Sequence, residues 1–584
     1  MRRIPLTRLD RIPDWIFLVA FCVVFSLQTL ASVARKSATF DEPPNLVSGY
    51  LELTRGQYWL KPEVLPLAKL IAATPLLWLH VRTPPLDADR WTLYDRTLYE
   101  FNDGDRMLMV ARAALLPFSL LLGGLVFVWT RRLFGRGAAL FALLLYAFEP
   151  NVLGHAPLVT TDLEVACLSF LVVYGLFRLV EEFSISRVGV VALALALALV
   201  TKLSTLVLVP LIALLGLVVS VMPLTVPVTF RGGPVSMLAD RGRKLAAFAV
   251  VLLVSSVAAY AVIWAVYRFD YNAAPSVPSP PDCPALLPAG AAPSAALDWL
   301  RRTRLLPEPY LHYFFQHAHL ARLIPGYLLG EIRQGGWWYY FIVTLLVKTP
   351  VPLLILTGLA LAVHARRWRQ APLVTVFLVV PAAVYFAFIS MSGLNIGHRH
   401  LLPMLPLLIT LVGVLVPWAA ARSAWAKTGL AILASWYVVS SLAVFPHYLA
   451  YFNEIAGGPA HGSRYLVDSN LDWGQDLTEL KRYMERHGID RVWLSYFGTA
   501  NPDYHGIRYD RLPGAALSGR APVRPELFAL DRLPRLPGTV AISVTNLRGV
   551  YLPCFGVSSE YFAAYRDVPP IAKVGYSIYL YRLE

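Results

Sequence analysis

Two adjacent carboxylates, Asp41 and Glu42, follow the first long apolar stretch, which runs from Trp15 to about Ala34. Charge beside the hydrocarbon of a bilayer is costly, so such residues usually have a function. The pair therefore indicates chemistry at the membrane surface. The alternative is that Asp41 caps the helix expected for EPPNLVSGYLEL, because Asp before Pro is common where helices begin. Position alone does not decide between these interpretations.

Further charged side chains are expected at the same membrane face. Asp162 lies at the outer start of the fourth apolar segment, and Lys202 lies where the fifth turns back. Lys348 in LVKTPVP falls within the eighth segment, nearer its outer end. The segment NIGHRHLLPMLP places His398 and Arg399 at the outer entry of the tenth. The sequence thus predicts one polar site on one leaflet.

Cations in such a place need an anionic partner. Either the carboxylates Asp41, Glu42, Glu63 and Asp162 pair with them internally, or they bind the phosphate of a lipid-linked ligand. Internal pairing is the simpler explanation for any single residue. The cations of the set outnumber the carboxylates placed to neutralise them, which favours a bound anion. The chain contains no HExxH zinc motif and no Walker-type glycine loop, which disfavours zinc hydrolysis and nucleotide-driven transport.

Composition defines the class of protein that must position these residues. Hydrophobic residues make up 57% of the 584, charged residues only 15%, and the mean hydropathy is +0.55. These values are typical of a polytopic membrane protein. Segments of about 17–25 apolar residues can cross a bilayer as helices. About eleven are expected, near 15–34, 108–130, 138–150, 163–180, 188–201, 204–222, 245–267, 338–363, 371–390, 401–419 and 428–446.

Basic residues in the short loops predict the orientation. They gather before the first segment and after the second and eighth, so that side should be cytoplasmic. The first segment is interpreted as a retained anchor rather than a cleaved signal. Asp41, the loops 35–107 and 268–337, and everything after Pro446 are then external. The basic residues used are Arg2, Arg3, Arg8, Arg11, Arg131, Arg132, Arg136, Arg231, Arg241, Arg243, Lys244, Arg366, Arg367, Arg369, Arg422 and Lys427.

The chain divides into two predicted domains. Residues 1–446 form an all-α transmembrane domain that includes both external loops, and residues 447–584 form a small external α/β domain. In the latter, RVWLSYFG, GTVAISV and YSIYLYRL are expected to be strands, and DLTELKRYMERHG a helix. Cys22 and Cys167 are expected inside helices. Cys283 and Cys554 are both external and could form one bridge, although nothing in the sequence establishes that they meet.

The segment DSNLDWGQD in the tail allows two interpretations. Asp468, Asp472 and Asp476 could bind a cation or a sugar, with Trp473 as a stacking surface. Alternatively, Asp472 caps a helix that begins near Trp473, and Asp468 closes a strand. The second interpretation is preferred.

Several motifs together resemble one family. The early Asp-Glu pair, PEVLPLAKLIAATPLL, EPNVLGHAPLVTTDLEV, KTPVP, GHRHLLPMLP and DSNLDWGQDLTELKRY occur in order over nearly the whole chain. They resemble bacterial members of the protein O-mannosyltransferase and lipid A aminoarabinose transferase superfamily, which are GT-C fold glycosyltransferases that use polyprenyl-phosphate sugars. One departure is that relatives often have His-Pro-Pro-Leu where this chain has Val64-Leu65-Pro66-Leu67, although Lys69 is retained.

The resemblance implies an inverting glycosyltransferase of the cell membrane in which Asp41 acts as general base. Glu42 and Asp162 would belong to the same acidic site, with Asp162 orienting the acceptor or a basic partner. The donor phosphate would be held first by Lys202 and Arg399, and behind them by Lys69, Lys348 and His398.

The partners implied are a polyprenyl-phosphate-linked sugar, a protein, lipid or glycan acceptor, and membrane lipids. No metal, cofactor or nucleic acid is expected. The rival hypothesis is a transporter or flippase for a lipid-linked or anionic solute, for which inverted repeats and a midplane site would be typical.

Overall fold

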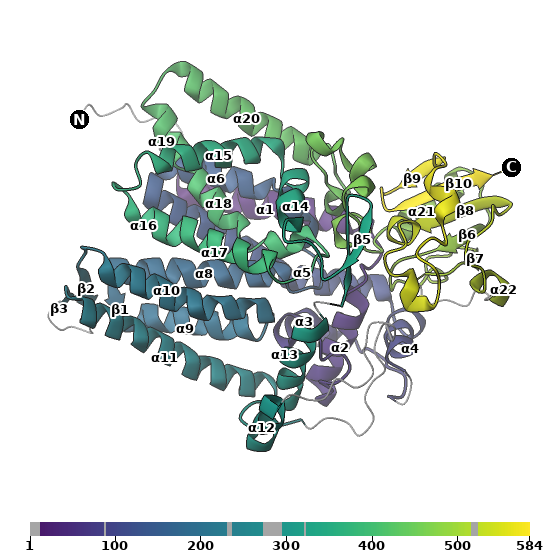
Figure 1. Ribbon diagram of the computed structural model, residues 1–584, viewed down its shortest axis with the longest axis horizontal. Helices are drawn as coiled ribbons and strands as arrows, with labels where there is room; N and C mark the ends of the chain where they lie inside the picture. Colours follow the sequence, from purple (N-terminus) through teal and green to yellow (C-terminus); the bar gives the residue numbers. More distant parts are fainter. Residues whose placement is uncertain are drawn as a thin grey trace.

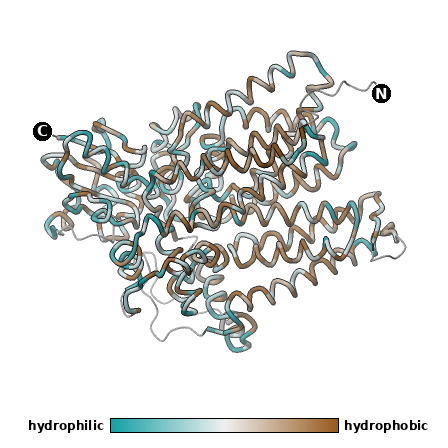
Figure 2. The backbone as a smooth tube through the Cα atoms, turned by 180° about the vertical axis from the view of Figure 1, so that it is seen from behind, coloured by the Kyte–Doolittle hydropathy of each residue, from teal (hydrophilic) through white to brown (hydrophobic). Residues whose placement is uncertain are grey.

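The computed structural model describes residues 12–86, 89–229, 236–272, 295–320, 323–514 and 524–583. Helices form an elongated bundle, and a mixed β-sheet region lies at one end of it (Figure 1). Apolar residues predominate along the helices of the bundle, whereas the sheet region is more mixed (Figure 2).

Six helices in the described ranges are long and apolar enough to cross a membrane. A bent pair, α14 (Tyr340–Lys348) and α15 (Val351–Ala365), whose axes differ by 114°, would make a seventh if it crosses as one span. Pro350 lies in the break, where it lacks the N–H that a continuous helix requires. The six are α1 (Asp14–Val33), α5 (Gly104–Phe134), α8 (Asp162–Glu181), η4 with α10 (Leu203–Val221), α11 (Arg241–Val266), and α16, η6 and α17 (Pro372–Ser390).

The expected count of eleven spanning helices is therefore not confirmed, although all eleven segments are largely helical. Three are short apolar helices: α6 (Arg136–Ala147), α9 (Ile185–Leu199), and α18 with α19 (Leu405–Ala420). The last, α20 (Ala424–Leu442), is not among the spans because Lys427 and several Ser and Thr residues dilute its apolar character. A further short apolar helix, α3 with η2 (Pro66–Trp78), lies in the predicted first external loop.

The helix α8 occupies the centre of the bundle and is almost entirely buried. It packs against α5, α9 and α10. At Gly175, a Cβ would lie 2.7 Å from Cγ2 of Val191 on α9, so this glycine permits the close approach of the two helices. The free cysteines Cys22 and Cys167 lie on α1 and α8, as expected.

The C-terminal region contains a five-stranded sheet of order β7-β6-β8-β10-β9. The middle strand β8 pairs with β6 in parallel and with β10 antiparallel. The three predicted strands and the predicted helix α21 (Leu477–Arg486) are confirmed. The strands are β6 (Val492–Ser495), β7 (Tyr509–Arg511), β8 (Gly538–Ser543), β9 (Ala572–Val574) and β10 (Ile578–Leu583).

One buried apolar cluster includes Leu163 of α8, Leu407 of α18 and Val540 of β8, so the bundle and the sheet share a core. The division at residues 446 and 447 stays a prediction. Cys283 lies outside the described residues, and its bridge to Cys554 stays a prediction as well.

Two small sheets were not predicted. One joins β1 (Phe183–Ser184), β2 (Val226–Thr229) and β3 (Ser236–Leu238), and the other is the hairpin of β4 (Pro325–Leu328) and β5 (Glu331–Gln334). The remaining helices are α2 (Glu42–Arg55), α4 (Arg90–Asp95), η3 (Arg96–Glu100), α7 (Pro150–His155), α12 (Ala295–Thr303), α13 (Glu308–Leu320), η7 (His398–Leu401), η8 (Tyr448–Ala450), η9 (Glu454–Ala456), η10 (Pro459–Arg464), η11 (Asp468–Asn470), α22 (Pro525–Phe528), α23 (Val544–Leu547), η12 (Leu552–Phe555) and α24 (Ala563–Arg566).

The helices α2, α3 and α4 lie at the end of the bundle that carries the sheet, and β1 to β3 and α19 lie at the opposite end (Figure 1). The predicted external and cytoplasmic segments thus separate to opposite ends. Which end faces the cytoplasm stays a prediction.

Candidate active site

Four charged side chains from distant parts of the chain form one cluster. Arg399 Nη1 donates to Asp41 Oδ2 at 3.2 Å and lies 3.7 Å from Asp162 Oδ2. Lys202 Nζ donates to Asp162 Oδ1 at 2.7 Å. The site predicted from sequence therefore contains a continuous chain of charges in the order Asp41, Arg399, Asp162 and Lys202.

Helix ends and breaks present these four residues. Asp162 is the first residue of α8, Lys202 lies in the break between α9 and η4, and Arg399 lies in the short helix η7. Asp41 precedes α2 at its N-cap position but makes no capping hydrogen bond. Its carboxylate bonds to Arg399 instead, so the capping interpretation of Asp41 is wrong.

Burial distinguishes the two carboxylates. The Asp162 side chain is 1% exposed and contacts both cations, whereas the Asp41 side chain is 27% exposed. Asp41 is therefore the carboxylate that a substrate can reach. Asp162 is placed to hold Lys202 and Arg399 side by side.

Charge in the cluster is balanced, with two carboxylates and two cations. The argument that cations outnumber their carboxylates is therefore wrong for these residues. The sequence could not show it, because Asp41 and Arg399 are 358 positions apart.

Glu42, the neighbour of Asp41, has a different environment. It is fully buried and accepts two hydrogen bonds from Arg112, at 2.8 and 2.6 Å. It also accepts from the backbone N–H groups of Thr39 and Val159 and from the Thr39 hydroxyl. These bonds occupy both carboxylate oxygens, and the residue fastens the loop that carries Asp41.

Two of the remaining predicted cations are engaged by protein groups other than the four cluster residues. Lys69 forms a buried ion pair with Glu52 and donates to the carbonyl of Lys61. Burial raises the pKa of the Glu52 carboxyl to about 7, while the Lys69 ammonium acts in the opposite direction. Lys348 ends α14, at the bend, and donates to the carbonyls of Leu449 and Asn470 at 3.0 and 2.7 Å.

His398 is adjacent to Arg399 and is 2% exposed. Among the residues that the structure describes, neither of its ring nitrogens has a hydrogen-bond partner. Its backbone N–H donates to Asn470 Oδ1 at 2.8 Å. His398 is therefore held by its backbone, and its ring makes no hydrogen bond among the described residues.

The DSNLDWGQD segment supplies residues that sequence reasoning did not assign to this site. The ring of Trp473 lies 4.2 Å from Arg399 Cζ, within the range of a cation–π contact. Asp468 lies near Arg399 and accepts from the Tyr551 hydroxyl. Burial raises the pKa of Asp468 to about 6, against the lowering effects of Tyr551 and Arg399. The Trp and Asp residues of the motif are the sequence feature from which this contact with the cluster could have been predicted.

Both parts of the preferred interpretation of that segment are wrong. The helix α21 begins at Leu477, and Asp472 instead accepts from the backbone N–H of Thr545 at 2.8 Å. Asp468 opens the short helix η11 with a φ of 57° rather than closing a strand. Burial raises the pKa of Asp472 to about 8, against the lowering effect of its bonds to Thr545.

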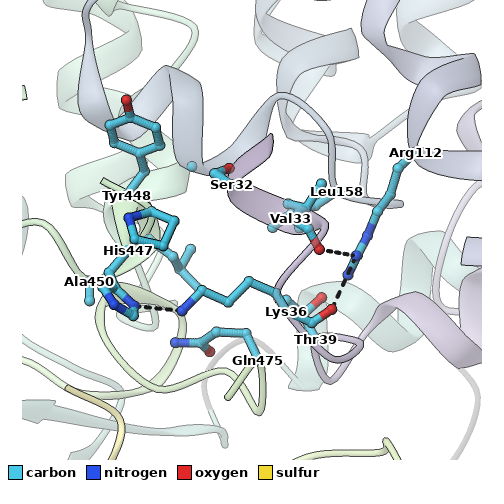
Figure 3. A pocket seen from close by; sticks show the side chains of 13 residues that line it. Ser32, Val33, Lys36, Thr39, Arg112, Leu158, His447, Tyr448, Ala450 and Gln475 are labelled. Carbon is cyan, nitrogen blue, oxygen red and sulfur yellow. Dashed lines mark hydrogen bonds between the residues drawn. The ribbon is translucent and has the colours of Figure 1, made fainter. Parts of the chain in front are cut away.

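A small pocket is lined in part by the loop that leads to Asp41. Lys36, Thr39, Arg112, His447 and Gln475 are among its lining residues, and Lys36 Nζ lies 2.6 Å from His447 Nδ1 (Figure 3). None of the four cluster residues lines it. The charged cluster, rather than this pocket, is the candidate site, since the reactive groups converge there.

Among the described residues, no three His, Cys, Asp or Glu side chains are grouped so that they could hold a metal ion. The expectation of a metal-free site stays a prediction.

Comparison with known proteins bears on the family. Residues 104–239, which include Asp162 and Lys202, match the family model described as dolichyl-phosphate-mannose-protein mannosyltransferase. This match confirms the resemblance to that superfamily. Over those residues the chain is thus similar to a family of membrane mannosyltransferases. A search of curated proteins gives no match.

Solved structures give weaker likenesses. Crystal structures of ArnT from Cupriavidus metallidurans, one in the apo state and one bound to undecaprenyl phosphate, are each 14% identical. Each alignment covers 97% of both chains with a TM-score of 0.44. An oligosaccharyltransferase from Archaeoglobus fulgidus is 10% identical, with a TM-score of 0.36 over 75% of this chain and 56% of its own. Such TM-scores support no conclusion about individual residues.

Proposed function

We propose that this chain is an inverting glycosyltransferase that moves a sugar from a polyprenyl-phosphate carrier to an external protein, lipid or glycan. The observation that carries the proposal is the cluster itself. An accessible carboxylate, Asp41, pairs with Arg399, and Asp162 joins Arg399 to a second cation, Lys202. The two cations can hold a phosphate. The name of the family model, which contains a dolichyl phosphate sugar, supports the same donor class.

The reaction assigned to the site is a displacement at the anomeric carbon. Asp41 accepts the proton of the acceptor hydroxyl or amine while the acceptor oxygen or nitrogen bonds to the anomeric carbon from the face opposite the phosphate. The bond between the anomeric carbon and the phosphate oxygen breaks, and its electron pair leaves with the polyprenyl phosphate. The configuration at the anomeric carbon is inverted.

Arg399 and Lys202 stabilise the phosphate as its negative charge grows. Charge that develops in a site with little water is stabilised more strongly than in bulk solvent. The Arg399 side chain is 11% exposed and that of Lys202 is 16% exposed, so both cations are largely removed from water. Asp162 holds both in place.

A bound phosphate would compete with Asp41 for Arg399. Asp41 accepts no capping bond from α2, and its hydrogen bond from Arg399 is 3.2 Å long, so Asp41 is the partner that can be displaced. Displacement would leave its carboxylate free to accept the acceptor proton. Donor binding and activation of the base are thereby linked.

The other predicted residues take lesser roles in this proposal. Lys348 and His398 are not assigned a contact with the phosphate. Two carbonyls engage the Lys348 ammonium, and the backbone N–H of His398 donates to Asn470. Lys69 and Glu42 maintain the structure of the loop and of α2 through buried ion pairs. We place the site outside the plasma membrane, with the amino terminus in the cytoplasm.

The test uses the full chain in nanodiscs with a panel of polyprenyl-phosphate sugars, following release of free polyprenyl phosphate. Arg399→Gln and Lys202→Gln should each slow release about 10- to 100-fold, since a bond to a charged group is worth about 1.5–3 kcal/mol. Arg508→Gln, an exposed arginine of the C-terminal region, is the matched control. If no donor is cleaved in nanodiscs while labelled lipid crosses the bilayer of sealed proteoliposomes, the chain is a transporter.

A further inference from the structure

Residues 468–475, here called the bridging segment, contact both halves of the charged cluster. This segment follows α20, the last helix of the bundle, and belongs to the region predicted as a separate external domain. Its contacts reach the loop before Asp41 on one side and the residues before Arg399 on the other. We infer that the bridging segment is part of the catalytic centre, and that Trp473 is a positioning residue for Arg399 and Asp41.

On the Asp41 side, the contacts are hydrogen bonds to the backbone of the bridging segment. Phe40 N donates to the Trp473 carbonyl at 2.8 Å, and Ser37 N donates to the Gln475 carbonyl at 3.0 Å. The Ser37 hydroxyl donates to the Gly474 carbonyl at 3.0 Å. The residue directly before Asp41 is thus fixed by Trp473. The position of the proposed base depends on the bridging segment.

Gly474 shows why the segment can approach so closely. Its φ is 88°, which favours glycine, and a Cβ there would lie 2.7 Å from Gly498 Cα and 2.9 Å from the Phe497 carbonyl oxygen. The Tyr496 hydroxyl also donates to the Gly474 carbonyl. The turn is therefore packed tightly on both sides, which suits a fixed support.

On the Arg399 side, the same segment binds the backbone of η7 and of the residues before it. Asn470 Oδ1 accepts from His398 N at 2.8 Å, and the Ser469 hydroxyl donates to the Ile396 carbonyl at 2.8 Å. A Cβ at Gly397 would lie 2.3 Å from Ser469 Oγ, so no other residue type fits without a shift. The same segment thereby fixes the backbone before Arg399 and the backbone before Asp41.

Trp473 connects the two sides. Its carbonyl fixes Phe40, and its ring lies against the guanidinium of Arg399, 4.2 Å from Cζ. Trp473 is 2% exposed. An aromatic face against the guanidinium limits the orientations that Arg399 can adopt. Its Nη1 donates to Asp41 and lies 3.7 Å from Asp162 Oδ2, and a phosphate would bind at the same nitrogen. The positioning role rests on the proposed function of Arg399.

The experiment measures binding of polyprenyl phosphate to the full chain in nanodiscs, together with KM and kcat for an accepted donor. Trp473→Leu removes the ring and should weaken polyprenyl phosphate binding about 5- to 30-fold, which is the range expected for a buried cation–π contact. Trp493→Leu is the matched control, because Trp493 also lies beside an arginine, Arg524, but in β6. That variant should bind polyprenyl phosphate as the parent does.

A double-mutant cycle separates positioning from general loss of structure. If Trp473 acts through Arg399, the effect of Trp473→Leu on polyprenyl phosphate binding should shrink to less than about 3-fold in an Arg399→Lys background, because lysine has no planar group to orient. Additive effects would overturn the inference. Should Trp473→Leu fail to fold, Trp473→Met replaces it in the same cycle, with the same two outcomes.

Failure of the inference is distinguishable from failure of the proposed function. A parent protein that neither binds polyprenyl phosphate nor cleaves any donor refutes the function. A parent protein that does both, with Trp473→Leu and Trp493→Leu equally active, refutes only the role of the bridging segment.

Discussion

Substitution of Asp41 should lower activity, whereas substitution of its neighbour Glu42 should lower stability. Asp41→Asn preserves the shape of a side chain that makes no capping bond and is partly exposed. Arg399 keeps a second carboxylate, Asp162, at 3.7 Å when Asp41 becomes neutral, so its charge is not left without a partner. We therefore expect the variant to fold with nearly unchanged stability. Loss of the general base should lower kcat about 10²–10⁴-fold.

Glu42→Gln should instead affect folding. Glu42 is fully buried and binds Arg112 through both carboxylate oxygens. Leaving one charge of a buried pair without its partner costs about 3–5 kcal/mol. Gln also carries an amide NH₂ where an acceptor is needed. In detergent, the unfolding temperature should be clearly lower for Glu42→Gln than for the parent, and nearly unchanged for Asp41→Asn.

The assay is release of polyprenyl phosphate in nanodiscs, with Asp490→Asn as control. Asp490 is an exposed carboxylate that also pairs with an arginine, Arg508, but in the C-terminal region. Because a neutral amide competes more weakly than a carboxylate for Arg399, the Asp41→Asn variant should bind polyprenyl phosphate at least as tightly as the parent. Turnover of Asp41→Asn within about 3-fold of the parent would refute the general-base role.

Four further outcomes are expected. Lys69→Met should destabilise the fold by leaving Glu52 buried without its ammonium, and adding Glu52→Leu should restore most of the thermal stability. A cysteine at the exposed position Asp490 should react with an impermeant thiol reagent in intact cells or spheroplasts, whereas labelling only after lysis would reverse the orientation. Burial raises the pKa of Asp468 to about 6, so the native state binds a proton more tightly than the unfolded chain. The free energy of unfolding should therefore decrease as the pH rises from about 4 to about 6, by an amount on the order of 3 kcal/mol. Asp468→Asn should remove that part of the pH dependence of thermal unfolding. Chelation with EDTA should leave donor cleavage unchanged, and restoration of lost activity by a divalent ion would contradict this.

Local patterns predicted local structure well. Long runs of apolar residues identified the helical segments. Short runs rich in β-branched and aromatic residues identified β6, β8 and β10. The number of spans was not predictable in the same way. Whether α6, α9 or the bent α14–α15 pair crosses a bilayer depends on tilt and on neighbouring helices, which apolar run length does not encode.

The candidate site was predicted as a set of residues but not as a set of contacts. Asp41, Asp162, Lys202 and Arg399 were all identified, because each is a charge beside an apolar segment. Their pairing joins positions 40 to 358 residues apart, and no local pattern specifies it. Glu42 and Lys69 carry the same signal as the cluster residues, and only their buried partners, Arg112 and Glu52, distinguish them.

The pairing within the cluster constrains how an anion could bind. Asp162 is buried and neutralises Lys202 at 2.7 Å, so removing it from the cations would leave a carboxylate unpaired in a site with little water. Asp41 is more exposed and can return to solvent at lower cost. A phosphate at Arg399 should therefore displace Asp41 and leave Asp162 in place. The residue that yields is the one that must then accept a proton, so a cluster with balanced charge is compatible with a phosphate site and provides a means of activating the base.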